Sequence, residues 1–90
     1  MRIVAVCGLG YGTSLILKSN IEKALKALDL EATVDAVGVA AARELGAEAN
    51  IIMTTEELKP ILEGLNAEII TVQHVIDVSE IKAKLEKALL

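Results

Sequence analysis

Four short apolar runs along the chain have the length and composition of buried β-strands. The second run places Thr33 and Asp35 between apolar residues, which is typical of a partly exposed strand at a sheet edge. The other three runs have aliphatic centres, such as Ile51 and Ile52 or Ile69 and Ile70. The predicted strands occupy residues 3–6, 31–37, 49–54 and 67–73.

The segments between the strands carry the apolar spacing of helices. From Thr13 to Leu28, apolar side chains recur every three or four residues, with lysine and glutamate on the other side. This pattern predicts an amphipathic helix. Residues 38–46 are rich in alanine and fit either a short helix or a loop with several turns.

Capping signals predict the two later helices. Thr54 and Thr55 precede two glutamates and are expected to cap a helix that ends near Gly64, although Pro60 delays its regular part. Residues 77–80 read Asp-Val-Ser-Glu, a capping box that opens an apolar-faced helix at the end of the chain.

The alternation of strands and helices predicts an α/β fold with a parallel sheet. Each connection is long enough to cross over and start the next strand in the same direction. Right-handed crossovers favour the strand order 2-1-3-4. We expect residues 1–90 to form one domain, a Rossmann/flavodoxin-like three-layer sandwich of four strands with helices on both sheet faces.

Composition narrows the class of function. The chain is 53% hydrophobic with a net charge of −4, and Tyr11 is its only aromatic residue. An acidic chain without clustered Lys and Arg repels a phosphate backbone, and one aromatic ring offers no platform for stacked bases. We therefore expect no nucleic-acid partner.

The single cysteine, Cys7, excludes an internal disulfide and a four-cysteine zinc site. One Cys and one His give no recognisable ligand spacing, so we predict neither a metal nor a cofactor. A free thiol fits a reducing compartment and predicts a cytoplasmic protein. No apolar stretch approaches the ~18 residues of a membrane-spanning helix, so any membrane involvement is expected through a partner.

A glycine-rich segment follows the first predicted strand at the switch point of the sheet, where ligand sites form above the strand ends. Alternating glycines let backbone N–H groups converge on an anion, Thr and Ser add hydroxyl donors, and the positive end of the next helix favours a thiolate. The pattern predicts a phosphate-binding loop with a reactive thiol. The segment reads Cys7, Gly8, Leu9, Gly10, Tyr11, Gly12, Thr13 and Ser14.

The same glycine-rich segment can be compared with a plain turn and with three other phosphate-binding loops. Glycines can simply make a tight turn beside a small buried cysteine. The lysine of a P-loop is missing, and a dinucleotide-binding fingerprint needs a different glycine spacing. Cysteine phosphatases place an arginine where this chain has Thr13, and that arginine binds the phosphoryl group in hydrolysis. Without it, a phosphocysteine would be left for transfer to another molecule.

The chain resembles the IIB components of the bacterial sugar phosphotransferase system (PTS), ascorbate and galactitol type. The resemblance lies in the first strand, this loop, the 51–55 segment and the closing helix. The loop is closer to the ascorbate branch. The resemblance implies a phosphohistidine–sugar phosphotransferase subunit. In it, Cys7 accepts a phosphoryl group from a phosphohistidine of an EIIA protein. It then passes the group to an ascorbate-like sugar in the membrane protein EIIC.

Three further positions are candidates for secondary roles. Thr54 and Thr55 end the third predicted strand at the same sheet edge as the loop, where their hydroxyls could reach phosphate; a helix cap is the simpler interpretation. His74 follows the fourth strand and could help to receive the phosphoryl group or contact EIIA; it could also be an ordinary exposed histidine. Two alternatives to a carrier stay open: a regulatory or anion-binding IIB-like module without turnover, and a phosphatase-like hydrolase.

Overall fold

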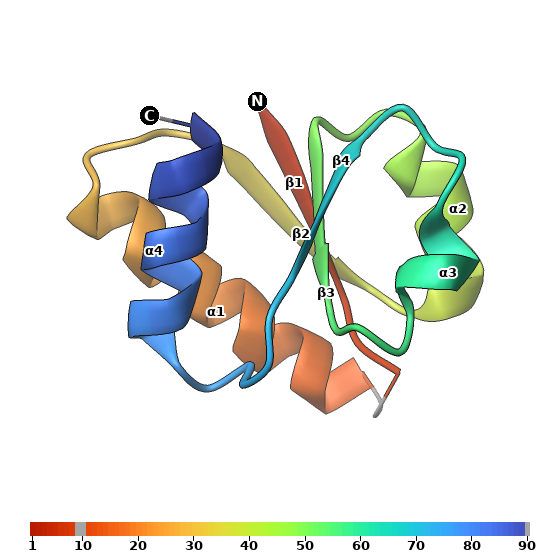
Figure 1. Cartoon of the computed structure of the whole chain (residues 1–90), viewed down its shortest axis with the longest axis horizontal. Coiled ribbons are helices and arrows are strands. Elements are labelled where there is room, and N and C mark those ends of the chain that lie inside the picture. The colour runs from red at the N-terminus through yellow and green to blue at the C-terminus, as the bar shows by residue number, and fades with distance from the viewer. Residues whose placement is uncertain (9–10, 90) are drawn as a thin grey trace.

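The structure, a computed structural model, describes residues 1–8 and 11–89. Strands and helices alternate along the chain, and Figure 1 shows the sheet edge-on between two layers of helices. The elements are β1 (Arg2–Val6), α1 (Tyr11–Ala27), β2 (Thr33–Val37), α2 (Val39–Gly46), β3 (Ile51–Thr54), α3 (Lys59–Leu62), β4 (Glu68–Thr71) and α4 (Val78–Leu89).

The four strands form one parallel sheet in the order β2-β1-β3-β4. Ile3 of β1 lies opposite Val34 on one side and Ile51 on the other, and Ile51 lies opposite Glu68 of β4. The predicted parallel α/β fold and its strand order are confirmed. β2 and β4 are the edges, as the mixed polarity of the second strand predicted.

Each face of the sheet is covered by two helices (Figure 1). Ile3 and Ala5 of β1 belong to the core cluster that α1 and α4 cover, whereas Val4 and Val6 belong to the cluster under α2 and α3. Successive strand residues point to opposite faces, so both sets of side chains are buried and β1 is aliphatic throughout.

Two helices differ from their sequence-based predictions. α1 begins at Tyr11, two residues before Thr13, so the end of the predicted loop belongs to its first turn. α3 covers only Lys59–Leu62, and its N-cap is Leu58 with no side-chain cap. The prediction that Thr54 and Thr55 cap this helix is wrong, because Pro60 fits only the first helical positions and moves the helix start toward itself.

Glu80 holds the β4–α4 loop from the first turn of α4. Its two carboxylate oxygens accept the backbone N–H groups of Gln73, at 2.8 Å, and His74, at 3.0 Å. Asp77 accepts the N–H of Glu80 at 3.2 Å and caps the helix as predicted. The capping box is therefore half formed, since Glu80 binds the loop while the N–H of Asp77 donates to the carbonyl of His74.

The loop is tied to two helices as well. The Lys84 ammonium donates to the carbonyl of Thr71 and lies 3.7 Å from Glu80. From α1, the buried Asn20 side chain donates to the carbonyl of Val75 at 2.7 Å. Because side chains from α1 and α4 bind its backbone, the β4–α4 loop has a defined conformation at the carboxyl edge of the sheet.

The loop contacts also set the ionisation of Glu80. Burial raises the pKa of this carboxyl, but the N–H donors of Gln73 and His74 and the positive charge of Lys84 outweigh it and leave the pKa below its ordinary value of 4.5. A carboxyl with a lowered folded-state pKa stabilises the fold above its unfolded pKa. That stabilisation is lost as the pH falls through the folded value.

We expect Glu80→Gln to lower the free energy of unfolding by about 1–2 kcal/mol at pH 7, because a neutral amide cannot accept both N–H groups. The deficit should shrink as the pH falls below 4.5, the ordinary pKa, since the wild-type carboxylate also becomes neutral. Urea unfolding at pH 7 and at a series of lower pH values measures both effects.

Glu86→Gln is the matched control, because Glu86 is an exposed carboxylate on the same helix. It should change stability by less than about 0.5 kcal/mol at either pH. A Glu80→Gln deficit that stays constant with pH would show that the charge of Glu80 does not support the loop.

Candidate functional site

Cys7 directly follows β1 at the carboxyl edge of the sheet. β1 lies between β2 and β3, and the chain leaves β1 for α1 on one face and leaves β3 for α3 on the other. The two connections diverge at this point, which makes it the switch point where parallel sheets form ligand sites. The sequence predicted Cys7 at this position, and the strand order places it there.

The thiol of Cys7 is nearly enclosed. The residue is 3% exposed, whereas the next residue, Gly8, is exposed. A β-carbon on Gly8 would lie 3.3 Å from Cδ2 of Leu58, so the side chain of the α3 N-cap residue packs beside Gly8. Low exposure agrees with the interpretation of Cys7 as a small buried residue, while its location agrees with a phosphate site.

The predicted phosphate loop begins at the end of β1 and finishes in the first turn of α1. Leu9 and Gly10 lie outside the described residues, and Tyr11 and Gly12 are placed only as the first backbone residues of α1. The first N–H groups of a helix have no partner within it and carry its positive end. An action of this helix end on Cys7 stays a prediction.

The two hydroxyl residues of the loop have different surroundings. Thr13 is half-buried on α1. Ser14 is fully buried, and its Oγ donates to the carbonyl of Val37, the last residue of β2, at 3.3 Å. The hydroxyl hydrogen of Ser14 is thus directed at the sheet, and a role in phosphate binding stays a prediction.

Thr54 ties the third strand to the first. It is fully buried, and its Oγ1 donates to the carbonyl of Val6, the residue before Cys7, at 2.9 Å. The hydroxyl therefore positions the end of β1 and supports the peptide that carries Cys7. Thr55 is half-buried, and its carbonyl accepts the N–H of Leu58 at 3.1 Å. Contacts of Thr54 or Thr55 with phosphate stay predictions.

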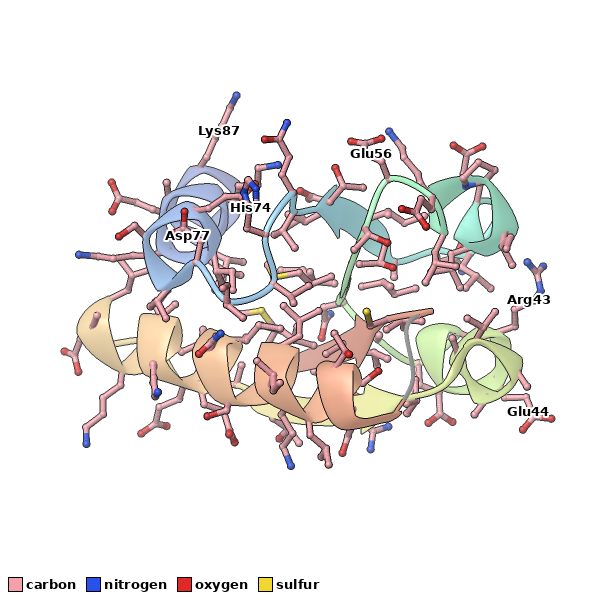
Figure 2. All side chains as sticks on the ribbon, turned by 90° about the horizontal axis from the view of Figure 1, so that it is seen from below. Arg43, Glu44, Glu56, His74, Asp77 and Lys87 are labelled. Atoms are coloured by element: carbon pink, nitrogen blue, oxygen red, sulfur yellow. The ribbon has the colours of Figure 1, made fainter. Side chains whose placement is uncertain are left out.

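His74 lies on the β4–α4 loop and is exposed. β4 is two strand spacings from β1, about 10 Å, so its loop lies beside the Cys7 site rather than in it. Figure 2 shows His74 next to Asp77 at the start of α4. A catalytic role for His74 stays a prediction, and its closest polar neighbours belong to its own loop and helix.

Within residues 1–8 and 11–89, one group of side chains has metal-ligand chemistry. The ligand atoms of His74, Asp77 and Glu80 lie within 4.8 Å of one another, so these residues could hold a metal ion. Their carboxylates already have structural partners, since Glu80 accepts two loop N–H groups and Asp77 accepts the N–H of Glu80. The helix end they occupy also disfavours a cation.

Sequence reasoning missed the side chains that shape the site from a distance. Asn20 lies in the middle of α1, where a polar residue beside the apolar face was the available signal. Leu58 had no signal, because a leucine within a predicted helix is common in any sequence. Two surface hollows, of about 740 and 350 Å³, lie away from Cys7, at the α1–β2 connection and between β4 and α4.

Along the described residues, none of the helices combines the length and apolar character needed to cross a membrane. This result concerns the helices alone.

Comparison with known proteins was made for sequence and for structure. The family model described as PTS system, lactose/cellobiose-specific IIB subunit, matches residues 2–87. The ascorbate-specific PTS system EIIB component of Mycoplasma pneumoniae is 34% identical over 93 residues, which cover 99% of this chain and 95% of that protein.

A similar structure is the lactose-specific IIB component domain of the Streptococcus pneumoniae phosphoenolpyruvate:carbohydrate phosphotransferase system. Its TM-score is 0.70 at 17% identity, with 99% of this chain and 94% of that chain covered, which shows a shared fold. The family match spans nearly all of the sequence, and the predicted family is confirmed. The chain belongs to the IIB subunit family of the sugar phosphotransferase system.

Proposed function

We propose that this chain is a phosphocarrier subunit in which Cys7 is the phosphoryl acceptor. The observation that carries the proposal is the position of this one cysteine, at the end of the central strand β1 and before the N-terminal end of α1, in a IIB family member. Phosphate sites favour this position because helix N–H groups and the helix dipole attract anions. Gly8 to Ser14 would form the phosphate-binding loop.

The proposed reaction has two transfers. The sulfur of Cys7, as thiolate, attacks phosphorus on a phosphohistidine of an EIIA protein; the S–P bond forms and the N–P bond breaks, leaving its electron pair on the imidazole. A sugar hydroxyl bound by the membrane protein EIIC then attacks the same phosphorus. The O–P bond forms, the S–P bond breaks, and the hydroxyl proton leaves, which restores the thiolate.

The chain's own residues contribute position and electrostatics rather than covalent assistance. The positive end of α1 attracts the oxygens of the added phosphoryl group. Thr54 fixes the carbonyl of Val6 and thereby the backbone that presents Cys7. Thr13 takes the place of a phosphatase arginine, so nothing at that position accelerates hydrolysis, and the phosphocysteine is left for transfer.

An ascorbate-like sugar is the proposed cargo. The Mycoplasma pneumoniae relative is named as ascorbate-specific, while the family model and the Streptococcus pneumoniae structure carry the names of lactose and cellobiose. We favour ascorbate because the 34% relative is matched over nearly the whole chain. The reducing compartment that suits a free thiol supports a cytoplasmic location.

One observation favours a second candidate function. Cys7 is 3% exposed, as expected for a IIB-like module that binds an anion or a partner without turnover. The carrier proposal requires the donor to reach the sulfur from the side of the exposed Gly8. The two functions differ in whether a covalent phosphoryl group appears on Cys7.

Incubation with a phosphorylated EIIA protein of the ascorbate type should add one acid-sensitive phosphoryl group to the chain, measured by intact mass. Cys7→Ser should lower the rate of this transfer at least about 100-fold, because a hydroxyl is a weak nucleophile without a base. Circular dichroism serves as the control that the variant is folded. A wild-type protein without adduct would exclude the carrier function, and fast release of free phosphate would favour the hydrolase.

Thr54→Val tests the support of Cys7 by the neighbouring strand. Valine keeps the shape but leaves the buried carbonyl of Val6 without its donor, which should lower the free energy of unfolding by about 1–3 kcal/mol. We also expect slower phosphorylation of Cys7. Urea unfolding and intact mass measure the two effects, and Thr54→Ser, which keeps the hydroxyl, is the matched control. Equal behaviour of the two variants would contradict a role for this hydrogen bond.

A further inference from the structure

Three of the five exposed large apolar side chains among the described residues lie toward the end of the molecule that carries Cys7. Ile76 on the β4–α4 loop is 73% exposed, the highest value among the large apolar residues that the structure describes. Leu15 and Ile16, in the second turn of α1, are 44% and 47% exposed. Exposed aliphatic side chains at one end of a chain with a net charge of −4 indicate a contact surface.

Ile16 and Ile76 lie on two elements that are in contact, α1 and the β4–α4 loop. Ile16 lies one turn before Asn20, so the two share one side of α1. Asn20 donates to the carbonyl of Val75, the residue before Ile76. Figure 2, which views the molecule from the carboxyl edge of the sheet, shows α1 passing beside the loop that leads into α4. We call Ile16 and Ile76 the isoleucine patch.

The patch is preorganised for binding. Ile76 lies on a loop whose backbone is bound by Glu80, Asn20 and, through the end of β4, Lys84. An exposed apolar side chain on a loop with this many anchors loses little conformational freedom when it is covered. These hydrogen bonds to the loop backbone therefore hold Ile76 in an exposed position, ready for contact with a partner.

We infer that the isoleucine patch is the docking contact for the phosphodonor protein, an inference that rests on the proposed function. Transfer from a histidine side chain to Cys7 requires the two proteins to touch around the sulfur, and the patch begins in the second turn of the helix that follows Cys7. The exposed Asp77 beside Ile76 adds a negative charge. The fitting partner face is apolar, with a basic side chain opposite Asp77.

The small size of the patch agrees with a partner that binds only transiently. The same sulfur accepts and then donates the phosphoryl group, so the donor protein has to dissociate before the second transfer. Two exposed isoleucines give a small apolar contact, as in transient complexes. A second copy of this chain on the patch would cover the Cys7 edge in both partners and block the reaction.

The test measures how the rate of Cys7 phosphorylation depends on donor concentration, using an EIIA protein of the ascorbate type phosphorylated on its histidine. Ile16→Ser and Ile76→Ser should each raise the donor concentration for half-maximal rate about tenfold, as for loss of an apolar contact at an interface. The rate at saturating donor should stay within about twofold of wild type. Ile61→Ser is the matched control, because Ile61 is 46% exposed on α3, on the other face of the sheet.

The outcomes separate the docking inference from the proposed function. A wild-type chain that never forms the adduct refutes the proposed function. Normal phosphorylation with unchanged donor dependence in both patch variants refutes the docking inference alone. The inference is also overturned if the variants keep donor kinetics but lose transfer to EIIC, or if sedimentation shows a wild-type dimer that Ile76→Ser dissociates.

Discussion

Each strand of this sheet ends on a carbonyl group that needs a donor from outside its own strand. The last carbonyl of β2 receives the Ser14 hydroxyl, that of β1 the Thr54 hydroxyl, and that of β4 the Lys84 ammonium. The last carbonyl of β3 receives the N–H of Val72. Buried backbone groups without partners cost about as much as a lost hydrogen bond, so these contacts fix where the strands stop and the loops begin.

This constraint explains why the hydroxyl residues around Cys7 act as supports. A parallel sheet places all its carboxyl ends at one edge, so the chemistry of the site and the satisfaction of the strand ends compete for the same side chains. Ser14 and Thr54 satisfy carbonyl groups, so the anion site that we propose at Cys7 would rely on backbone N–H groups at the start of α1.

The β4–α4 loop extends the same principle to the surface. Glu80 of α4 accepts hydrogen bonds from two loop N–H groups, and Asn20 of α1 donates one to a loop carbonyl. The two helices therefore order the loop together. The most exposed large apolar side chain of the described residues, Ile76, lies on this loop, directly after the Val75 carbonyl that Asn20 of α1 binds.

The sequence by itself determined the fold class, the strand order and the place of Cys7 at the switch point. Aliphatic runs and amphipathic spacing are local patterns, and crossover handedness limits the order in which such strands assemble. Tertiary structure decided where α3 begins, which carbonyls Ser14 and Thr54 bind, and that Glu80 reaches back to Gln73 and His74 instead of closing its capping box. The reason is that a hydroxyl or carboxylate takes whichever unpaired backbone group lies within reach, and only packing brings residues such as Thr54 and Val6 together across 48 positions of the chain.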